Sequence, residues 1–226
     1  MDYYIYYGLT ILAFIITSLA QAFVMSTYKK YSSVKVRKNI TGREAARIIL
    51  DKNDLKDVDV EEVKGYLSDH YDPSKKVVRL SSSNYNGSSI ASVSVASHEC
   101  GHAIQDKVGY TFMRFRSSLV PIVNFSSYAG YIAIVIGLLL SSIKVIFIGI
   151  ALELVILLFQ IVTLSVEIDA SNRALKEIDK LSFLEGDEYK SGKSVLIAAA
   201  LTYVASVAAA LLEILRLVLV FGKKNR

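Results

Sequence analysis

The chain has 226 residues, of which 53% are hydrophobic, and a mean hydropathy of +0.40, which is too apolar for an ordinary soluble domain and indicates membrane spans. Its formal net charge of +5 is more typical of the orientation signal of a membrane protein than of nucleic-acid binding, which we do not expect. The single cysteine, Cys100, excludes an internal disulfide.

Residues 1–28 are predicted to form an N-terminal transmembrane anchor. No charged residue occurs from Tyr3 to Tyr28, and a helix of that length, at about 1.5 Å per residue, can cross roughly 30 Å of hydrocarbon. The stretch SLAQA resembles a signal cleavage site, but Asp2 and the lack of a basic residue before the apolar run argue against a cleaved signal peptide.

Residues 29–116 are predicted to form a small α+β region outside the membrane. Thr41 is placed to cap a helix through GREAARIIL, and DPSKK then predicts a turn into a strand at residues 77–80. The following segment is rich in alanine and serine, with serines available as N-caps and Gly109 as a stop. We therefore expect a helix that carries the sequence HECGH.

The remainder of the chain contains further apolar runs. Residues 117–166 are predicted to form a transmembrane hairpin, and residues 167–194 a cytoplasmic helix. Residues 195–226 are predicted to form an apolar helix that is either transmembrane or re-entrant, because it carries Glu213 and Arg216.

The distribution of basic residues predicts the orientation. Lysine and arginine follow the first run, precede the second and recur between the third and fourth. The positive-inside rule therefore places residues 29–116 and 167–194 in the cytoplasm. The C-terminal KKNR disagrees, because a complete fourth span would leave these charges outside, so the side of the C-terminus stays open.

Three charged residues interrupt the apolar runs, namely Glu153, Glu213 and Arg216. Charges are costly within a bilayer, and pairing with one another would reduce that cost. For Glu213 and Arg216, snorkelling or a short fourth span is an equally good explanation.

The HECGH sequence has the spacing of a metal site. On a helix, residues four apart lie on one face about one turn apart, so His98 and His102 can bind one zinc ion through neutral imidazole nitrogens. Glu99 lies about 100° round the helix from His98 and can reach a water without occupying a coordination position, as a general base must. Cys100 faces away from the metal and is expected to pack in the core. Such strings also arise by chance in unrelated helices. Two histidines are not enough to form a zinc site, so a third ligand is needed.

The candidates for the third ligand are His70, Glu153, Glu167 and Asp169. A continuous helix would place Glu153 about 21 Å before Glu167, deep in the bilayer. The predicted hairpin returns the chain at Val166 to the face where HECGH must lie, so Glu167 emerges at the membrane surface and is the preferred candidate.

Helical spacing from Glu167 supports this choice. Small residues share its face and permit close packing against the metal helix, namely Ala170, Ser171 and Ala174. Asp169 points elsewhere and can pair with Arg173 at i+4.

Other polar residues leave two interpretations open. His70 is a candidate transition-state stabiliser or substrate contact, or else it stabilises the turn before the strand together with Asp69 and Asp72. Arg173 either assists an oxyanion or forms a plain ion pair. Asp106 either orients a ligand imidazole or lies at a solvated helix end.

The stretches DHYDP, VRLSSSNYN, ASHECGHAIQD and VEIDASNRAL resemble the YugP-type neutral zinc metallopeptidases, which are bacterial membrane proteins, and more distantly the HtpX-type proteases of the gluzincin group. The resemblance covers nearly the whole chain. It implies a zinc site formed by His98, His102 and Glu167, with Glu99 as the catalytic acid and base. One departure is Ser171, where the HtpX-type pattern has an aspartate, so support for the ligands must come from elsewhere.

These observations predict a mainly α membrane protein with three to four transmembrane helices and a small α+β zincin-like cytoplasmic metallopeptidase domain. We expect a multi-pass protein of the bacterial cytoplasmic membrane with one Zn²⁺ per chain and an active site facing the cytoplasm. Its partners would be the lipid bilayer and a peptide or protein substrate, including membrane proteins. Substrate specificity and oligomeric state are not evident from the sequence.

The predicted activity is that of a zinc-dependent endopeptidase. Glu99 would deprotonate a zinc-activated water that attacks the peptide bond, and the strand at residues 77–80 could hold the substrate by main-chain pairing. The alternative is a non-catalytic membrane scaffold or regulatory protein stabilised by zinc. Glu99 discriminates between them, since a structural zinc site needs no base and tends to have four protein ligands.

Overall fold

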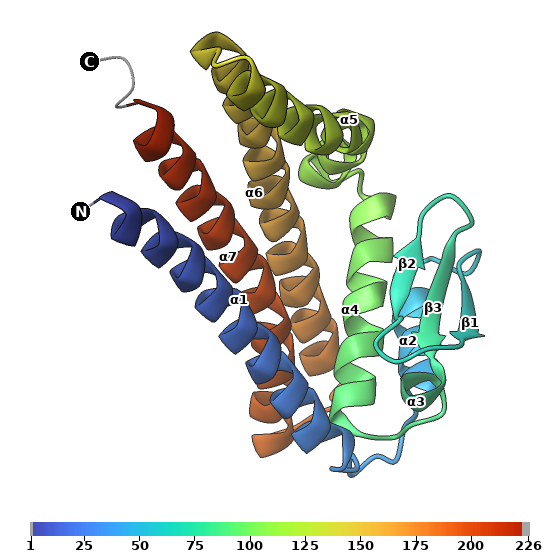
Figure 1. Ribbon diagram of the computed structural model, residues 1–226. Helices are drawn as coiled ribbons and strands as arrows, with labels where there is room; N and C mark the ends of the chain where they lie inside the picture. The colour runs from blue at the N-terminus through green and yellow to red at the C-terminus, as the bar shows by residue number, and fades with distance from the viewer. Residues whose placement is uncertain (1, 223–226) are drawn as a thin grey trace. The chain divides into compact units, whose positions relative to one another are not determined.

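The computed structural model describes residues 2–222, and the C-terminal KKNR lies outside the described residues. Within that range, four helices are long and apolar enough to cross a membrane. They are α1 (Asp2–Ser32), α5 (Thr111–Leu139), α6 (Ile143–Lys180) and α7 (Asp187–Gly222) (Figure 1). The fold is therefore mainly helical, with four candidate spans. The fourth apolar run forms part of one unbroken helix, α7.

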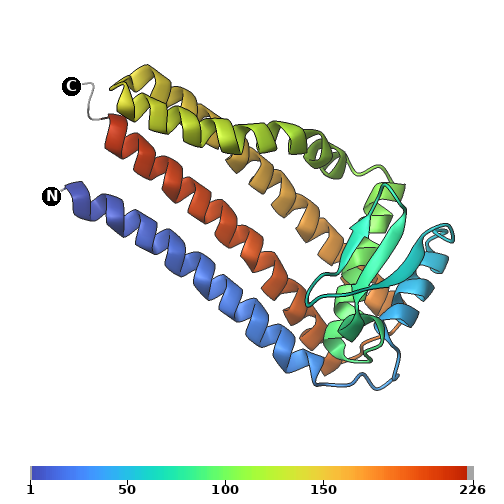
Figure 2. The ribbon, with the colours of Figure 1, turned by 45° about the vertical axis from the view of Figure 1, so that its right-hand side comes forward.

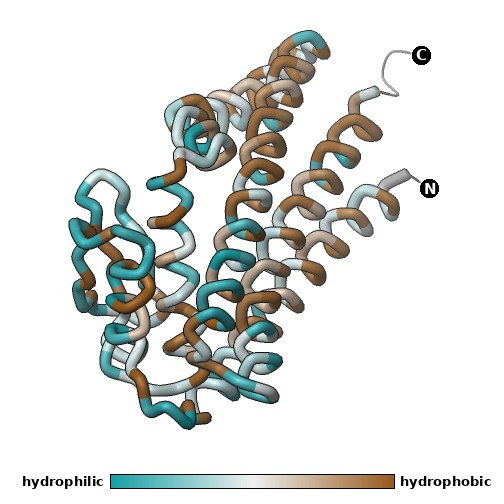
Figure 3. The backbone as a smooth tube through the Cα atoms, turned by 180° about the vertical axis from the view of Figure 1, so that it is seen from behind, coloured by the Kyte–Doolittle hydropathy of each residue, from teal (hydrophilic) through white to brown (hydrophobic). Residues whose placement is uncertain are grey.

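The chain forms two compact units, which are described separately. Among the described residues, the first contains 2–21, 114–165 and 202–222. The second contains Ala22–Met113 and Val166–Leu201. Hydrophobic residues predominate along the long helices, whereas polar residues are frequent around the small sheet (Figure 3).

The first unit is held together by close helix packing. A Cβ atom at Gly149 of α6 would lie 2.8 Å from the carbonyl oxygen of Gly130 in α5, so glycine allows these two backbones to approach. The hydroxyl of Tyr6 donates to the carbonyl of Leu219 at 3.3 Å. The N-terminal end of α1 therefore lies beside the C-terminal end of α7 (Figure 2).

The predicted pairing of charges in the apolar runs is confirmed for one pair. Arg216 Nε donates to Glu213 Oε2 at 2.9 Å, three residues apart on α7. Glu153, on α6, is not a member of this ion pair. An arginine and a glutamate that neutralise each other reduce the cost of placing both on an apolar helix.

The second unit contains helix α2 (Gly42–Lys52), a short helix α3 (Ser82–Tyr85), helix α4 (Ile90–Lys107) and a small sheet. The strands of the sheet are β1 (Asp59–Val63), β2 (His70–Asp72) and β3 (Val77–Ser81), in the order β1-β3-β2. Strand β1 is parallel to β3, and β2 is antiparallel to it. The core lies between the sheet, α2 and α4, and includes Ile49, Leu50, Val78, Leu80 and Val93.

The predicted caps of α2 and α4 are confirmed. Thr41 and Glu44 form a capping box at α2, in which Thr41 Oγ1 accepts from the Glu44 amide at 3.2 Å. Ser89 caps α4 by accepting from the Ser92 amide at 3.0 Å. Gly109 follows the end of α4 with φ of 63°, a left-handed conformation that favours glycine.

The predicted strand at residues 77–80 is present as β3, but its predicted role in binding substrate is wrong. Strand β3 is the central strand, with β1 on one side and β2 on the other. Its main-chain groups therefore already pair within the sheet and leave no free edge for a substrate. Four of its five residues are buried, as expected for a central strand.

Candidate metal centre

Helix α4 presents two different faces because its side chains repeat every 3.6 residues. Cys100 is fully buried in the core, where its Sγ lies 3.6 Å from the carbonyl oxygen of Ala46, so the prediction that it packs away from the histidines is confirmed. His98 and His102 lie on the other side, with ring centroids 4.8 Å apart and ring planes at 85°. One face of α4 therefore anchors the helix while the other carries the imidazoles.

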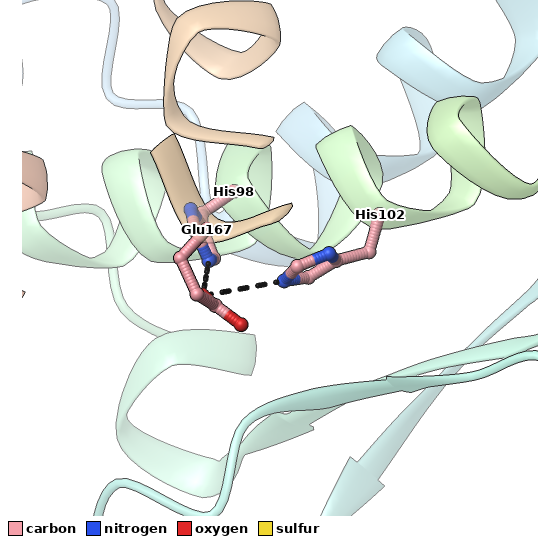
Figure 4. A group of neighbouring side chains, drawn as sticks. All are labelled: His98, His102 and Glu167. Carbon is pink, nitrogen blue, oxygen red and sulfur yellow. Dashed lines mark hydrogen bonds and ion pairs between the residues drawn. The ribbon is translucent and has the colours of Figure 1, made fainter. Parts of the chain in front are cut away.

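Glu167 of α6 reaches both imidazoles. Its Oε2 lies 3.2 Å from His98 Nε2 and 3.6 Å from His102 Nε2 (Figure 4). One ligand atom from each of the three residues lies within 4.8 Å of the others. The structure thus brings together the two histidines and the glutamate chosen from the sequence, all within the second unit.

The approach of α6 to α4 depends on small residues. A Cβ atom at Gly101 would lie 2.5 Å from the carbonyl oxygen of Ala170, so glycine is needed between the two histidines. Ala170 and Ala174 are buried on the same side of α6 as Glu167, as helical spacing predicted. Because α6 is continuous from Ile143 to Lys180, no break separates Glu167 from the apolar run before it.

The ring nitrogens that do not face Glu167 have partners of their own. His102 Nδ1 lies 2.9 Å from Gln105 Oε1, and His98 Nδ1 lies 3.2 Å from Ser171 Oγ. These contacts hold the rings with both Nε2 atoms directed at the glutamate. Outer hydrogen bonds of this kind commonly orient histidines that bind metals.

This set of donors fits a zinc ion. Imidazole nitrogen and carboxylate oxygen are both good zinc ligands. Among the described residues the group consists of three protein donors, fewer than the four of a closed structural site, and so leaves a coordination position for water or substrate. His98, His102 and Glu167 would hold the ion.

Glu99 is buried beside this group without being a member of it. Its side chain is only 8% exposed, and the burial raises the pKa of its carboxyl, while His98 and His102 act in the opposite direction. Its position next to His98 on α4 matches that expected of a base which does not bind the metal.

His70 lies apart from the three clustered residues. It is exposed on β2, and its Nδ1 lies 2.8 Å from the carbonyl oxygen of Ser68. Its role as a transition-state stabiliser stays a prediction. The neighbouring Asp72 stabilises the turn into β3, since it accepts from the amide and hydroxyl of Ser74, and these bonds, together with Arg79, hold the pKa of its carboxyl below its usual range.

Asp106 and Arg173 have partners other than a ligand. The hydroxyl of Tyr71 donates to Asp106 Oδ2 at 2.9 Å in the last turn of α4, while the imidazole Nδ1 atoms contact Gln105 and Ser171. Arg173 Nε donates to Asp169 Oδ2 at 2.6 Å, which confirms the predicted i+4 ion pair.

Two supporting residues escaped the sequence interpretation. The sequence pattern predicts that Ser171 gives no support, yet its hydroxyl lies 3.2 Å from Nδ1 of the His98 imidazole. Gln105 was not singled out, although it lies three residues after His102 on a helix, the spacing at which side chains meet. A polar side chain three residues after a histidine on the same helix was the sequence signal that could have identified Gln105 as its hydrogen-bond partner.

The chain was compared with known proteins. Residues 6–222 match the family described as "Putative neutral zinc metallopeptidase". The chain is 46% identical over 213 residues to the "Putative membrane protease YugP" of Bacillus subtilis (strain 168). The alignment covers 94% of this chain and 95% of that protein. No solved structure matches. The match to nearly the full length, together with the cluster of two histidines and a glutamate, shows that the chain belongs to this family of neutral zinc metallopeptidases.

Proposed function

We propose that this protein is a membrane-embedded zinc endopeptidase of the gluzincin type, which hydrolyses peptide bonds in peptides or membrane proteins. The observation that carries the proposal is the convergence of His98, His102 and Glu167, with Glu99 buried beside them. Membership of a zinc metallopeptidase family supports zinc as the metal. A relative named as a membrane protease supports the location in a membrane.

The reaction divides between the metal and this chain's own residues. Zinc, when bound, supplies Lewis-acid polarisation of the peptide carbonyl and an acidified water. Glu99 accepts the proton of the attacking water and returns it to the leaving nitrogen, so one carboxylate serves as base and then as acid. Its burial keeps bulk water away from the proton that it carries between the two transfers.

The proposed orientation places the metal centre on the cytoplasmic side of a bacterial membrane crossed four times. Basic residues in the segments 29–116 and 167–194 support this side. The contact between Tyr6 and Leu219 is what four crossings require, because the start of α1 and the end of α7 then share the outer side.

A second candidate is a scaffold in which zinc only ties α4 to α6. It is favoured by the fact that the donors come from both helices. The presence of Glu99 and the count of three donors in the described cluster favour the enzyme, because a structural site needs neither a base nor an open position.

The test is Glu99→Gln, which has almost the same size and lies off the edge of α4 that faces the metal. We expect zinc content and folding to be unchanged and peptide cleavage to fall by about 10²–10⁴-fold, because an amide cannot transfer the proton. Cleavage would be followed on purified protein, and substrates sought by proteomics of membranes holding either form. Wild-type cleavage by zinc-loaded Glu99→Gln would end the enzyme proposal.

A further inference from the structure

Gln105 is a fully buried side chain that contacts both helices of the metal centre. It lies on α4 with 0% of its surface exposed. Its Nε2 donates to the carbonyl of Val166 at 2.8 Å and to Asp169 Oδ2 at 2.8 Å, both on α6. Its Oε1 lies 2.9 Å from His102 Nδ1. A single amide therefore bridges a ligand imidazole and the turn of α6 that carries Glu167.

The partners of Gln105 determine which way its amide points. A carbonyl and a carboxylate can only accept, so the amide NH₂ group must face Val166 and Asp169. The amide oxygen must then face His102, and because that oxygen can only accept, His102 Nδ1 must carry the proton. In the neutral imidazole that binds a metal, Nε2 is then unprotonated, and its lone pair faces Glu167.

His98 provides a contrast within the same site. Its Nδ1 contacts the hydroxyl of Ser171, which can donate or accept, so this contact does not select a tautomer. The two histidines are thus held by different kinds of partner, and only His102 has its proton placed by the fold.

We infer that Gln105 is a positioning residue of the metal centre. It selects the Nδ1–H tautomer of His102, which makes Nε2 the ligand, and it holds the backbone next to Glu167 at the distance that both histidines require. The inference rests on the proposed zinc site and deepens it. Asp169 takes part through its ion pair with Arg173, which holds the carboxylate that Gln105 contacts.

The first experiment measures zinc affinity by competition with a chelator in the full-length protein. Gln105→Leu keeps the approximate size of the side chain but removes both kinds of hydrogen bond. We expect zinc affinity to fall by about 10- to 100-fold, the usual effect of losing a partner of a ligand histidine. Ser94→Ala is the matched control, because Ser94 is also buried on α4 but its hydroxyl donates to the carbonyl of Ile90 within the same helix. Equal affinity in Gln105→Leu and Ser94→Ala would overturn the inference.

A second measurement distinguishes positioning from general loss of structure. The chain has three histidines, so the ring signals of ¹⁵N-histidine-labelled, zinc-loaded protein are few. In the wild type we expect the His102 Nδ1 proton to be hydrogen-bonded and protected from exchange with water. In Gln105→Leu that protection should be lost while the His98 signals stay unchanged. An unchanged Nδ1 proton of His102 would refute the assignment.

A rescue experiment covers the case in which Gln105→Leu does not fold. Gln105→Glu keeps an acceptor for His102 but sets a carboxylate against Asp169 and the Val166 carbonyl, so zinc affinity should fall. Adding Asp169→Asn supplies an N–H donor to that carboxylate and should restore part of the affinity, because the Val166 carbonyl still faces a carboxylate. Failure of the double variant to recover would contradict the role of the bridge to α6.

The outcomes separate this inference from the proposed function. If the wild-type protein binds no zinc, the proposed enzyme and the positioning role of Gln105 both fail. If the wild type binds zinc and cleaves peptides, but the Gln105 variants bind zinc as tightly, only the positioning role is lost.

Discussion

The histidine rings of the metal centre are held by their Nδ1 atoms rather than by burial alone. The Gln105 amide oxygen contacts Nδ1 of His102, and the Ser171 hydroxyl contacts Nδ1 of His98. Each Nε2 atom is therefore directed at Glu167. Holding the donors in place before metal binds reduces the entropy that binding must offset. The ligand residues should therefore be far more sensitive to substitution than neighbouring polar residues.

Alanine at position 98 or 102 should abolish stoichiometric zinc binding, because two remaining donors hold the ion poorly. Glu167→Ala should weaken binding strongly. Metal analysis of the purified protein, with one zinc ion per chain expected for the wild type, would test both. His70→Ala is the control and should keep its zinc, since His70 lies outside the cluster. Full zinc occupancy in Glu167→Ala would remove Glu167 from the ligand set.

The packing of α4 against α6 is the step that assembles the site from two separate helices. The contact is close at Gly101, where an added Cβ would meet the backbone of Ala170 rather than a flexible side chain. The backbone carbonyl cannot move aside without moving the helix that carries Glu167.

Gly101→Ala should therefore push α6 away from α4. We expect a loss of stability of about 1–3 kcal/mol from overpacking, together with weaker zinc binding. Thermal unfolding in detergent and chelator competition would measure the two effects. Gly8→Ala is the control, because a Cβ at Gly8 meets nothing within 4 Å. If Gly101→Ala bound zinc like the wild type, the contact would not be what sets the ligand distance.

Asp69 joins the sheet to α3 and α1 in the second unit. Its Oδ1 accepts from the amide of Ser81 at 2.8 Å, and its Oδ2 accepts from Asn84 Nδ2 at 3.0 Å. Asn84 Oδ1 in turn accepts from the hydroxyl of Tyr28 at 2.9 Å. Ser81 and Asn84 are buried, so loss of the carboxylate would leave donors without a partner.

Asp69→Ala should lower the free energy of unfolding by about 1–3 kcal/mol, the usual cost of an unsatisfied buried polar group. Circular dichroism during thermal unfolding would detect it. Asp57→Ala is a suitable comparison, because Asp57 is exposed and pairs with the exposed Lys76, so little change is expected. Equal unfolding temperatures for the two variants would show that Asp69 is not a structural junction.

The four long apolar helices of residues 2–222 and the membrane protease relative support membrane association of the chain. If the proposed function holds, the direction in which the helices cross the membrane decides which compartment supplies substrates. Basic residues beside the apolar runs predict that direction, because transfer of lysine and arginine across the membrane is disfavoured.

The turn between α5 and α6 should be extracytoplasmic. In a Cys100→Ser background, a new cysteine at Ser142 should react with a membrane-impermeant reagent in intact cells. A cysteine at Lys52, an exposed residue of α2, should react only after the membrane is broken. The reverse pattern of labelling would overturn the proposed orientation.

Features that depend on neighbouring residues were predictable from the sequence. The spacing of His98 and His102, the capping box at Thr41 and the direction of Cys100 away from the histidines follow from helix geometry, which repeats whatever the rest of the chain does. The strand at residues 77–80 was recognisable for the same reason, since turn and strand patterns are local.

Features that depend on contacts between distant segments required the folded chain. Strand order made β3 central, which local alternation cannot reveal. The distances from Glu167 to both histidines arise from the packing of α6 on Gly101. The tautomer of His102 depends on acceptors 61 and 64 residues away from Gln105. Helical periodicity places a side chain on a face, but which face meets which partner is decided by long-range packing of the core.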